Sequence, residues 1–389
     1  MAFKFRKNPL SFIDMLKTKN IAKKRQKMLA KGSLKDIPAS DPTQDLAKQL
    51  HHPMKPFKII EINDFNDEIK SFKFSPVDGK KLAFFKPGQY IAIQIKDKDL
   101  LVTRPFTLAS SPNEAVDKNY YEVTIKKLDK GLFTTWLFKN AKVGTIVNIA
   151  SPEGDFAYNP IRDQKHIVCL AGGTGITPFV SMAKSIVSGT LKDVKMTLFH
   201  GFPSMDFGVW VKELQELAKQ SDNFEYVPVC EKSDPNIKES GFISKALVDK
   251  YVKDKYTIFA CGSNAFYNFI LKEFKHLQEK DFRLEKNIIG WREVSNLKKF
   301  KIKVHLLDEE YDITCLNSQT VLSALEENHV DAANRCRVGH CGFCHAKCVK
   351  GKYTMVLKTR RSSDLDFDYF HACCSYPETD LEIIVNPNK

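Results

Sequence analysis

The chain has 389 residues, enough for two or three domains that each bury a core of their own. Hydrophobic residues make up 43% and charged residues 28%, as is typical of globular proteins, and no apolar run is long enough for a membrane-spanning helix. The N-terminus lacks an apolar stretch with a cleavage site, and ten cysteines are scattered along the chain. We therefore expect a reduced, cytoplasmic protein rather than a secreted one.

The formal charge of +13 belongs mainly to residues 1–52, which hold twelve Lys/Arg and four Asp/Glu. A charge gathered in a tail does not indicate a nucleic-acid-binding domain. A lysine-rich helix is predicted from Ser11, a serine N-cap, to about Lys31, and a polar, proline-containing linker follows at 36–42. We interpret residues 1–52 as a solvated, partly helical basic extension. The alternative is that they contact an acidic partner or, peripherally, an anionic membrane surface.

Short runs that alternate apolar and polar residues dominate residues 53–160, with Gly, Pro and Asp between them. A period of two predicts strands with one buried face, and many short strands favour an antiparallel β-barrel. The clearest runs are 57–60, 90–95, 121–125 and 145–149.

Arg104-Pro105-Phe106-Thr107 ends one of these strands and predicts a site for a planar ligand that carries phosphate. Arginine can pair with phosphate, Phe106 can stack on a ring, and the Thr107 hydroxyl can bond a ring nitrogen. Gly131 precedes a helix expected from Thr134 to Lys139. A helix start led by glycine can offer backbone N–H groups to a pyrophosphate.

Residues 161–292 alternate apolar runs with helical patterns, which predicts a doubly wound α/β domain. The run 166–171 reads as a buried parallel strand, and a glycine-rich turn and a helix at 179–187 follow it. Strand, glycine-rich turn and helix is the arrangement that receives a pyrophosphate on N–H groups. The candidate residues of this turn are Gly172, Gly173, Thr174, Gly175 and Thr177.

The turn Gly-Gly-Thr-Gly-Ile-Thr-Pro at 172–178 resembles that of the nicotinamide domain of the ferredoxin–NADP reductase superfamily. This resemblance implies that the loop after the next strand meets the adenosine ribose of a nicotinamide dinucleotide. The loop has no Arg or Lys between His200 and Val211 that could hold a 2′-phosphate, and it carries Asp206, which can accept from a 2′-hydroxyl. This favours NADH over NADPH. The other interpretation of Asp206 is a helix N-cap.

Cys336, Cys341 and Cys344 have the spacing C-x4-C-x2-C, and Cys373, or less favourably Cys374, can supply a fourth thiolate. This is the plant-type [2Fe–2S] pattern, whereas zinc sites usually have two C-x2-C pairs or a Cys/His set. A hairpin at 300–315 and a helix at 320–328 precede the loop. Two strands and a helix before a cluster loop favour a β-grasp ferredoxin domain.

Several of these motifs, taken in order, resemble the ferredoxin–NADP reductase superfamily: Phe-x-Pro-Gly-Gln-Tyr at 85–90, Arg104-x-Phe106-Thr107, Gly131-x-x-Thr134, the glycine-rich turn, and Cys261-Gly262. The resemblance implies FAD, with FMN as the alternative. It implies that Thr107 lies near flavin N5 and Cys261 near the reactive nicotinamide carbon, which makes these two the candidate catalytic residues, with Gly262 beside the cofactor. It also assigns the fourth cluster ligand to Cys373. Asn287 stands where an aromatic residue is expected to cover the flavin.

The order of domains (53–160 flavin, 161–292 nicotinamide, 293–389 ferredoxin) resembles that of the phthalate dioxygenase reductases and hybrid-cluster-protein reductases. It implies a reductase that passes a hydride from NADH to flavin, then single electrons through the cluster to an acceptor protein such as an oxygenase or another redox enzyme. The alternatives are a diaphorase-like reductase of small acceptors and a membrane-docked module that feeds a respiratory complex. Basic residues near the cluster loop predict a rim for an acidic acceptor: Arg335, Arg337, Lys347, Lys350 and Lys352, with Lys358, Arg360 and Arg361 further on. The other interpretation is that these charges are scattered over the fold and solvated.

Overall fold

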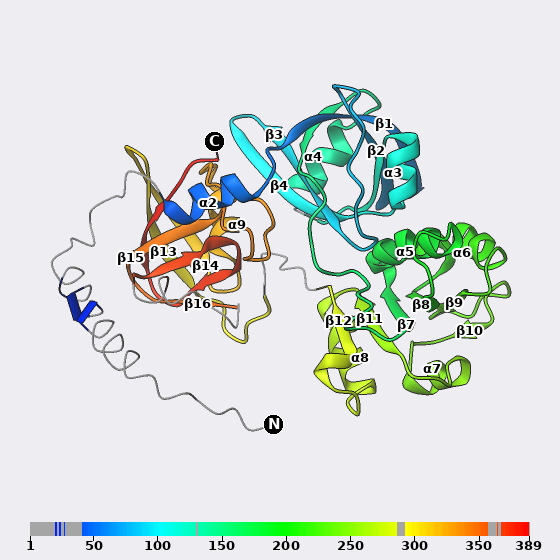
Figure 1. Cartoon of the computed structure of the whole chain (residues 1–389). Helices are drawn as coiled ribbons and strands as arrows, with labels where there is room; N and C mark the ends of the chain where they lie inside the picture. Colours follow the sequence, from blue (N-terminus) through cyan, green and yellow to red (C-terminus); the bar gives the residue numbers. More distant parts are fainter. Residues whose placement is uncertain are drawn as a thin grey trace, which may run out of the picture.

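The computed structural model describes residues 20, 21, 23, 24, 27, 41–129, 131–285, 292–356, 364 and 367–388. The helix expected over Ser11–Lys31 falls almost wholly outside these residues, as do Asn287 and the basic residues Lys358, Arg360 and Arg361. Three large sheets, each with a core of its own, and one two-stranded sheet form among the described residues, so the prediction of three architectures is confirmed (Figure 1).

The first sheet is antiparallel and has the strand order β4-β3-β6-β1-β2-β5. An isolated bridge between Leu108 and Val123 brings its two edge regions together, as in a barrel. Phe72, Phe74 and Phe133 are among the residues that fill the interior. Its elements are β1 (Lys55–Asn66), β2 (Ile69–Pro76), β3 (Tyr90–Asp97), β4 (Leu100–Thr107), α3 (Pro112–Lys118), β5 (Tyr121–Lys126), α4 (Leu132–Asn140) and β6 (Ile146–Ile149).

The second sheet is parallel and has the order β10-β9-β8-β7-β11-β12. Helices α5 and α6 pack on one face and α7 and α8 on the other, as expected of a doubly wound fold. Its strands are β7 (His166–Gly172), β8 (Lys195–Phe202), β9 (Phe224–Cys230), β10 (Glu239–Ser240), β11 (Thr257–Cys261) and β12 (Phe282–Leu284). Its α-helices are α5 (Thr177–Val187), α6 (Val211–Ala218), α7 (Lys245–Tyr251) and α8 (Asn264–Glu273).

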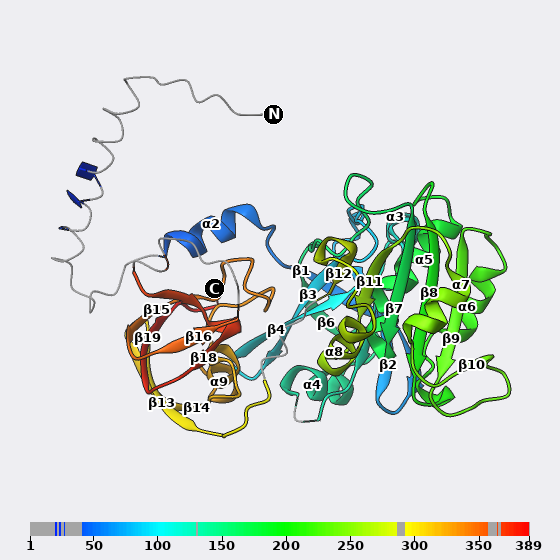
Figure 2. The ribbon, with the colours of Figure 1, turned by 90° about the horizontal axis from the view of Figure 1, so that it is seen from below.

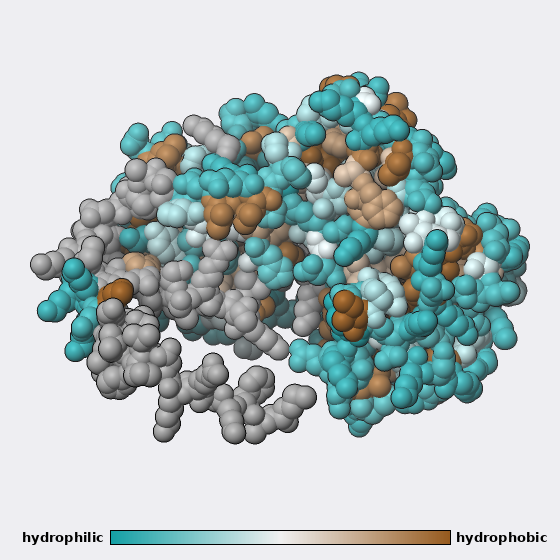
Figure 3. Space-filling view, viewed as in Figure 1, coloured by the Kyte–Doolittle hydropathy of each residue, from teal (hydrophilic) through white to brown (hydrophobic). Residues whose placement is uncertain are grey.

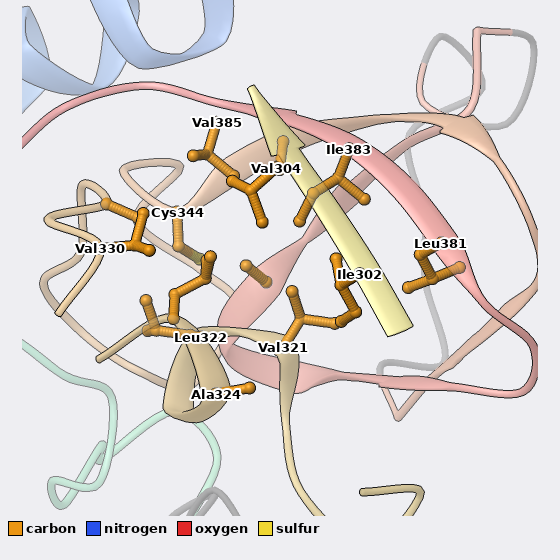
Figure 4. Close-up of a cluster of buried hydrophobic side chains, with 14 of the residues drawn as sticks. Ile302, Val304, Val321, Leu322, Ala324, Val330, Cys344, Leu381, Ile383 and Val385 are labelled. Carbon is orange, nitrogen blue, oxygen red and sulfur yellow. The ribbon is translucent and has the colours of Figure 1, made fainter. Parts of the chain in front are cut away.

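The third sheet has the order β14-β13-β19-β15-β17, with β13 and β19 parallel and the other pairs antiparallel. Helix α9 (Val321–Glu327) buries Val321, Leu322 and Leu325 against it, and Figure 4 shows this core. The arrangement is the expected β-grasp. Its strands are β13 (Lys299–Leu306), β14 (Glu309–Leu316), β15 (His345–Lys350), β17 (Tyr369–His371) and β19 (Leu381–Val385), beside a short pair β16 (Tyr353–Met355) and β18 (Ser375–Pro377).

Helix α2 (Pro42–Leu50) precedes the flavin barrel in sequence but lies against the ferredoxin domain (Figures 1 and 2). Asp41 caps it, since Oδ1 accepts hydrogen bonds from the N–H groups of Thr43 and Gln44. Asp41, Gln44 and Ala47 are buried. This end of the basic segment is therefore docked, and the interpretation of all of residues 1–52 as a solvated extension is wrong for residues 41–52.

In the part of the chain that the structure describes, no helix is both long and apolar enough to cross a membrane. The face displayed in Figure 3 is mostly hydrophilic, with hydrophobic residues in separate patches.

Candidate active site

A cavity of about 770 Å3 lies between the flavin barrel and the C-terminal ends of β7, β8 and β11. Its volume is in the range typical of ligand sites, and the ends of parallel strands are where α/β sheets bind cofactors. The predicted residues that line it are Pro105, Phe106, Thr107, Gly172, Gly173, Thr174, Gly175, Thr177, Cys261 and Gly262. The tertiary structure therefore brings the flavin motif of β4 and the nicotinamide motifs of β7 and β11 to one place.

The glycine-rich turn forms a 3-10 turn (Gly173–Ile176) that leads directly into α5. Gly175 allows its close approach to β11, because a Cβ at this position would lie 2.2 Å from the carbonyl oxygen of Cys261. His200, near the end of β8, contacts the turn through its imidazole. Its Nε2 lies 3.1 Å from the Gly173 oxygen, and its Nδ1 lies 3.0 Å from the Tyr226 hydroxyl. Burial lowers the pKa of His200 to about 4, so the imidazole is neutral. Sequence reasoning overlooked His200.

Glu285, directly after β12, joins the two halves of the cavity. Thr107 Oγ1 donates to its Oε1 over 2.6 Å, and the Cys261 thiol donates to its Oε2 over 3.0 Å. Glu285 is buried, and burial raises the pKa of its carboxyl. Burial, followed by the neighbouring Glu285, raises the pKa of the Cys261 thiol well above its usual value. The carboxyl therefore fixes both predicted catalytic side chains, and no local pattern in the sequence marks it.

Of two acidic residues near the ends of β8 and β9, Glu231 lines the cavity and Asp206 does not. Glu231 lines the cavity beside Phe202 and Pro203, whereas Asp206 lies on a short 3-10 turn outside the lining. The backbone oxygen of Asp206 accepts from Asn66 Nδ2 over 2.6 Å. The sequence signal for Glu231 was an acid directly after a buried strand end, at the edge where parallel strands present ligand groups.

The four predicted cluster cysteines are buried free thiols. Cys336 lies beside Cys341 and Cys344 lies beside Cys373, while Cys374 also adjoins Cys373. Among the described residues, no three His, Cys, Asp or Glu side chains are set to share one metal ion. A [2Fe–2S] cluster takes two protein ligands at each of two irons. The two pairs therefore fit a binuclear cluster.

The loop also provides hydrogen bonds to sulfur. Cys336 Sγ accepts from the N–H groups of Val338 and Cys341, each over 3.4 Å. The Cys341 thiol and these N–H groups lower the pKa of Cys336 to about 6. Thiolate is the form that binds iron, and this lowering favours it at Cys336, whereas the pKa values of Cys341, Cys344 and Cys373 are raised.

Three family models match the chain in the same order as its sheets. They are described as an oxidoreductase FAD-binding domain (residues 56–158), an oxidoreductase NAD-binding domain (169–272) and a 2Fe-2S iron-sulfur cluster binding domain (304–378). The chain is a three-domain flavin/iron–sulfur reductase. Its cofactors are FAD, a nicotinamide dinucleotide and a [2Fe–2S] cluster.

Two curated relatives span most of the reductase. The glycine betaine monooxygenase reductase subunit of Chromohalobacter salexigens is 24% identical over 341 residues, which cover 81% of this chain and 91% of that protein. NADH oxidoreductase HCR of Escherichia coli strain K12 is 24% identical over 303 residues, 76% of this chain and 88% of that protein. The structure of phthalate dioxygenase reductase shares the fold with a TM-score of 0.63 and 18% identity, covering 86% of this chain and 98% of that one.

Two ion-pair groups join the ferredoxin domain of the reductase to its flavin domain. Arg104 donates two hydrogen bonds to Glu326 of α9, over 3.0 and 2.9 Å, and Arg337 of the cluster loop donates to the same carboxylate over 2.7 Å. Arg335 pairs with Glu153 over 2.5 Å. Arg104 therefore faces the ferredoxin domain and does not line the cavity.

These contacts overturn the predicted basic rim at two of its positions. Arg335 and Arg337 are buried and paired inside the reductase, so neither is available to an acidic acceptor. His340 is the exposed residue of the loop from Cys336 to Cys344. Basic residues near each other in sequence were separated by the fold, because side chains of a tight ligand loop point to different sides.

Tyr90 of β3 lies between the cavity and the cluster loop. It lines the cavity, and its backbone exchanges two hydrogen bonds with Glu153, the partner of Arg335. Burial, then the charges of Cys336, Glu153 and Cys341, raise the pKa of its phenol, so these groups surround it. Tyr90 therefore connects the wall of the cofactor cavity, through Glu153 and Arg335, to the segment that holds the cluster cysteines.

Gly131 and Thr134 stand at the start of α4, outside the cavity lining. Thr134 is buried, and its hydroxyl accepts from the N–H of Leu128 over 3.1 Å. This hydrogen bond shapes the turn that precedes α4.

Proposed function

We propose that the reductase oxidises NADH, passes a hydride to FAD and delivers single electrons through the [2Fe–2S] cluster to an acceptor redox protein. The observation that carries this proposal is the shared cavity. It places Phe106 and Thr107 of the flavin barrel against Cys261 and Gly262 of the parallel sheet, with Tyr90 on the side of the cluster cysteines.

Each lining residue then has a proposed role. Phe106 would contact the flavin ring system, and its own ring is supported 5.2 Å away by Phe133. Thr107 and Cys261 would face the reacting atoms, with the Thr107 hydroxyl near the flavin ring nitrogen and the Cys261 thiol beside the nicotinamide. Glu285 would keep the Thr107 hydroxyl and the Cys261 thiol at fixed positions. Fixed geometry of this kind accounts for much of the rate of group transfer in enzymes.

The phosphate-binding parts are proposed as follows. The turn Gly172–Thr177 would take the pyrophosphate of NADH on its N–H groups at the start of α5. Gly131 and Thr134 remain our proposal for the pyrophosphate end of FAD. Arg104 would bind a flavin phosphate if its guanidinium left Glu326 and paired with that phosphate instead. For the ribose of NADH we propose Asp206 and Glu231 as the acidic partners.

FAD, when bound, takes up two electrons together as a hydride and releases them one at a time, which matches a two-electron donor, NADH, to a one-electron acceptor, the cluster. Cys336, Cys341, Cys344 and Cys373 would hold the cluster that receives them. Tyr90 and Glu153 would link the wall of the flavin cavity to the ligand loop through the ion pair of Glu153 with Arg335. The exposed His340 marks the side from which an acceptor could approach the cluster.

We propose an oxygenase component or another redox enzyme as the acceptor. The name of the Chromohalobacter relative, a monooxygenase reductase subunit, supports the first of these. All ten cysteines are free thiols, which supports the reducing cytoplasm as the site of action. We also propose the domain limits 53–160, 161–292 and 293–389, with residues 41–52 assigned to the ferredoxin unit rather than to a separate extension. Contact of residues 1–40 with a membrane or an acidic partner stays a proposal.

The test is anaerobic stopped-flow mixing of the FAD- and iron-loaded protein with NADH. Flavin absorbance should fall first and cluster absorbance second, with two irons per chain. NADPH should give a much slower first phase. Cluster bleaching without flavin reduction, or flavin reduction that never reaches the cluster, would refute the proposed order of electron transfer.

A further inference from the structure

Helix α2 covers the cluster-ligand loop. Gln44 Nε2 donates to the Phe343 oxygen over 3.0 Å, within the segment between Cys341 and Cys344. The aromatic rings of His51 and Phe343 lie 5.7 Å apart at the end of the helix. Gln44 and Ala47, the inner face of α2, are each 4% exposed. A helix that stands outside the ferredoxin domain in sequence thus supplies part of the wall around the cluster site.

The fit between helix and loop is close at Gly342. A Cβ on this glycine would lie 3.2 Å from Ala47 Cβ and 3.4 Å from Thr43 Cγ2. Gly342 also has a φ of +85°, which other residues rarely adopt. The ligand loop therefore has no side chain of its own at this point, and α2 fills the space.

A buried polar contact fixes the start of the helix. Asp41 caps α2 with Oδ1 and reaches His345 Nδ1 with Oδ2 over 2.7 Å, and both side chains are almost fully buried. His345 Nε2 lies 3.3 Å from Asp364 Oδ1, and its ring stacks on Tyr369 at 4.6 Å. His345 follows Cys344 directly, so Asp41 ties the helix to the residue beside a cluster ligand.

The chain then crosses from the ferredoxin domain to the flavin barrel. His51 Nδ1 lies 3.0 Å from Glu153 Oε1, and the His52 oxygen accepts from Arg335 Nη1 over 2.8 Å. β1 begins at Lys55. This passage links the ferredoxin domain directly to the flavin barrel, in addition to the segment between β12 and β13, which links the ferredoxin domain to the nicotinamide domain. Two tethers leave far fewer relative positions than one, because closing the second contact becomes intramolecular.

We propose that α2 is a strap of the iron–sulfur centre, which keeps water from the Cys341–Cys344 side of the cluster and holds the ligand loop on the flavin barrel. Asp41, Gln44 and Ala47 are its positioning residues. This inference rests on the proposed electron path and deepens it. Solvent exposure and hydrogen bonding around the sulfurs tune the potential of such clusters. Reduction adds negative charge, which water stabilises, so removal of the strap should make the midpoint potential less negative.

The first test compares the full chain with two truncations, one lacking residues 1–40 and one lacking residues 1–50. The variant without 1–40 keeps the whole strap and is the matched control. We expect a less negative cluster potential and faster amide hydrogen exchange over 336–344 only after removal of 1–50. NADH-driven flavin reduction should be the same in all three. Equal potentials and equal exchange in both truncations would overturn the inference.

Point variants decide the matter if the shorter chain fails to fold. Ala47→Glu places a carboxylate against Gly342, while Gln49→Glu places the same group on the exposed face of the same helix. We expect Ala47→Glu to shift the potential, to alter the electron paramagnetic resonance signal of the reduced cluster and to speed cluster loss in air. Gln49→Glu should match the wild type, and identical behaviour of the two variants would count against the strap. Absence of iron in the full chain would instead refute the cluster assignment.

Discussion

Glu326 offers the sharpest test of how the ferredoxin domain is held. Its carboxylate is buried and accepts three charge-assisted hydrogen bonds, two from Arg104 and one from Arg337. Glu326→Gln preserves shape but leaves two partly or fully buried guanidinium groups without a counter-charge. Removing one partner from a buried ionic group costs about 3–5 kcal/mol, and we expect a loss of this size in the free energy of unfolding of the ferredoxin domain at pH 7.

The assay is a urea titration followed by cluster absorbance, with Glu327→Gln as the control. Glu327 is the exposed neighbour on the same helix, and its change should stay within about 0.5 kcal/mol. A loss of less than about 1 kcal/mol in the free energy of unfolding for Glu326→Gln would refute the idea that Glu326 holds the ferredoxin domain through Arg104 and Arg337. Repeating the titration with and without FAD tests Arg104 as well. If Arg104 leaves Glu326 to bind a flavin phosphate, the effect of the substitution should shrink when FAD is bound.

The same carboxylate predicts the pH dependence of the effect. Burial alone would raise the pKa of Glu326, but Arg337 and Arg104 outweigh it and hold the pKa below its usual 4.5. A lowered folded-state pKa contributes stability above the unfolded value, and this contribution is lost as the pH falls through the folded-state pKa. The difference between wild type and Glu326→Gln should therefore be full at neutral pH and shrink only below about pH 4.5.

Three further outcomes follow from the site. Glu285→Gln should slow hydride transfer from NADH to the flavin by about 10- to 100-fold, because Thr107 and Cys261 lose their common hydrogen-bond partner. The melting temperature at pH 7 should stay the same or rise, because burial disfavours the charged form of Glu285. An unchanged hydride-transfer rate would show that Glu285 has no part in the mechanism. Cys341→Ser should abolish cluster absorbance and leave flavin reduction by NADH intact, and retention of two irons per chain would contradict the ligand set. The double variant Glu231→Gln, Ser204→Arg should reduce the ratio of kcat/KM for NADH to that for NADPH by about tenfold or more, because an acid is removed and a cation for the 2′-phosphate is added. The same experiment with Asp206→Ala in place of Glu231→Gln shows which of the two acids sets the preference.

Much of the chemistry could be predicted from local patterns. C-x4-C-x2-C brings three thiolates onto one short loop whatever surrounds it, and a glycine-rich turn between a strand and a helix presents N–H groups by its own geometry. Alternation with a period of two distinguished the barrel from the α/β domain, because burial of one face follows directly from the pleat. The three architectures and the cofactor set were therefore readable from the sequence.

The contacts that join these parts were decided only by the tertiary structure. Glu285 lies 178 residues from Thr107, and Asp41 lies 304 residues from His345. Arg104 was assigned to a phosphate by its motif, yet it faces a carboxylate from another domain. Arg335 and Arg337 looked like surface charges and are buried in pairs. A sequence shows that a side chain is charged, but its partner depends on which surfaces the packed domains bring together. For the same reason the sequence of residues 41–52 gave no sign that they cover the cluster loop. Two of their three buried residues, Asp41 and Gln44, are polar, and their partners His345 and Phe343 belong to a distant part of the chain.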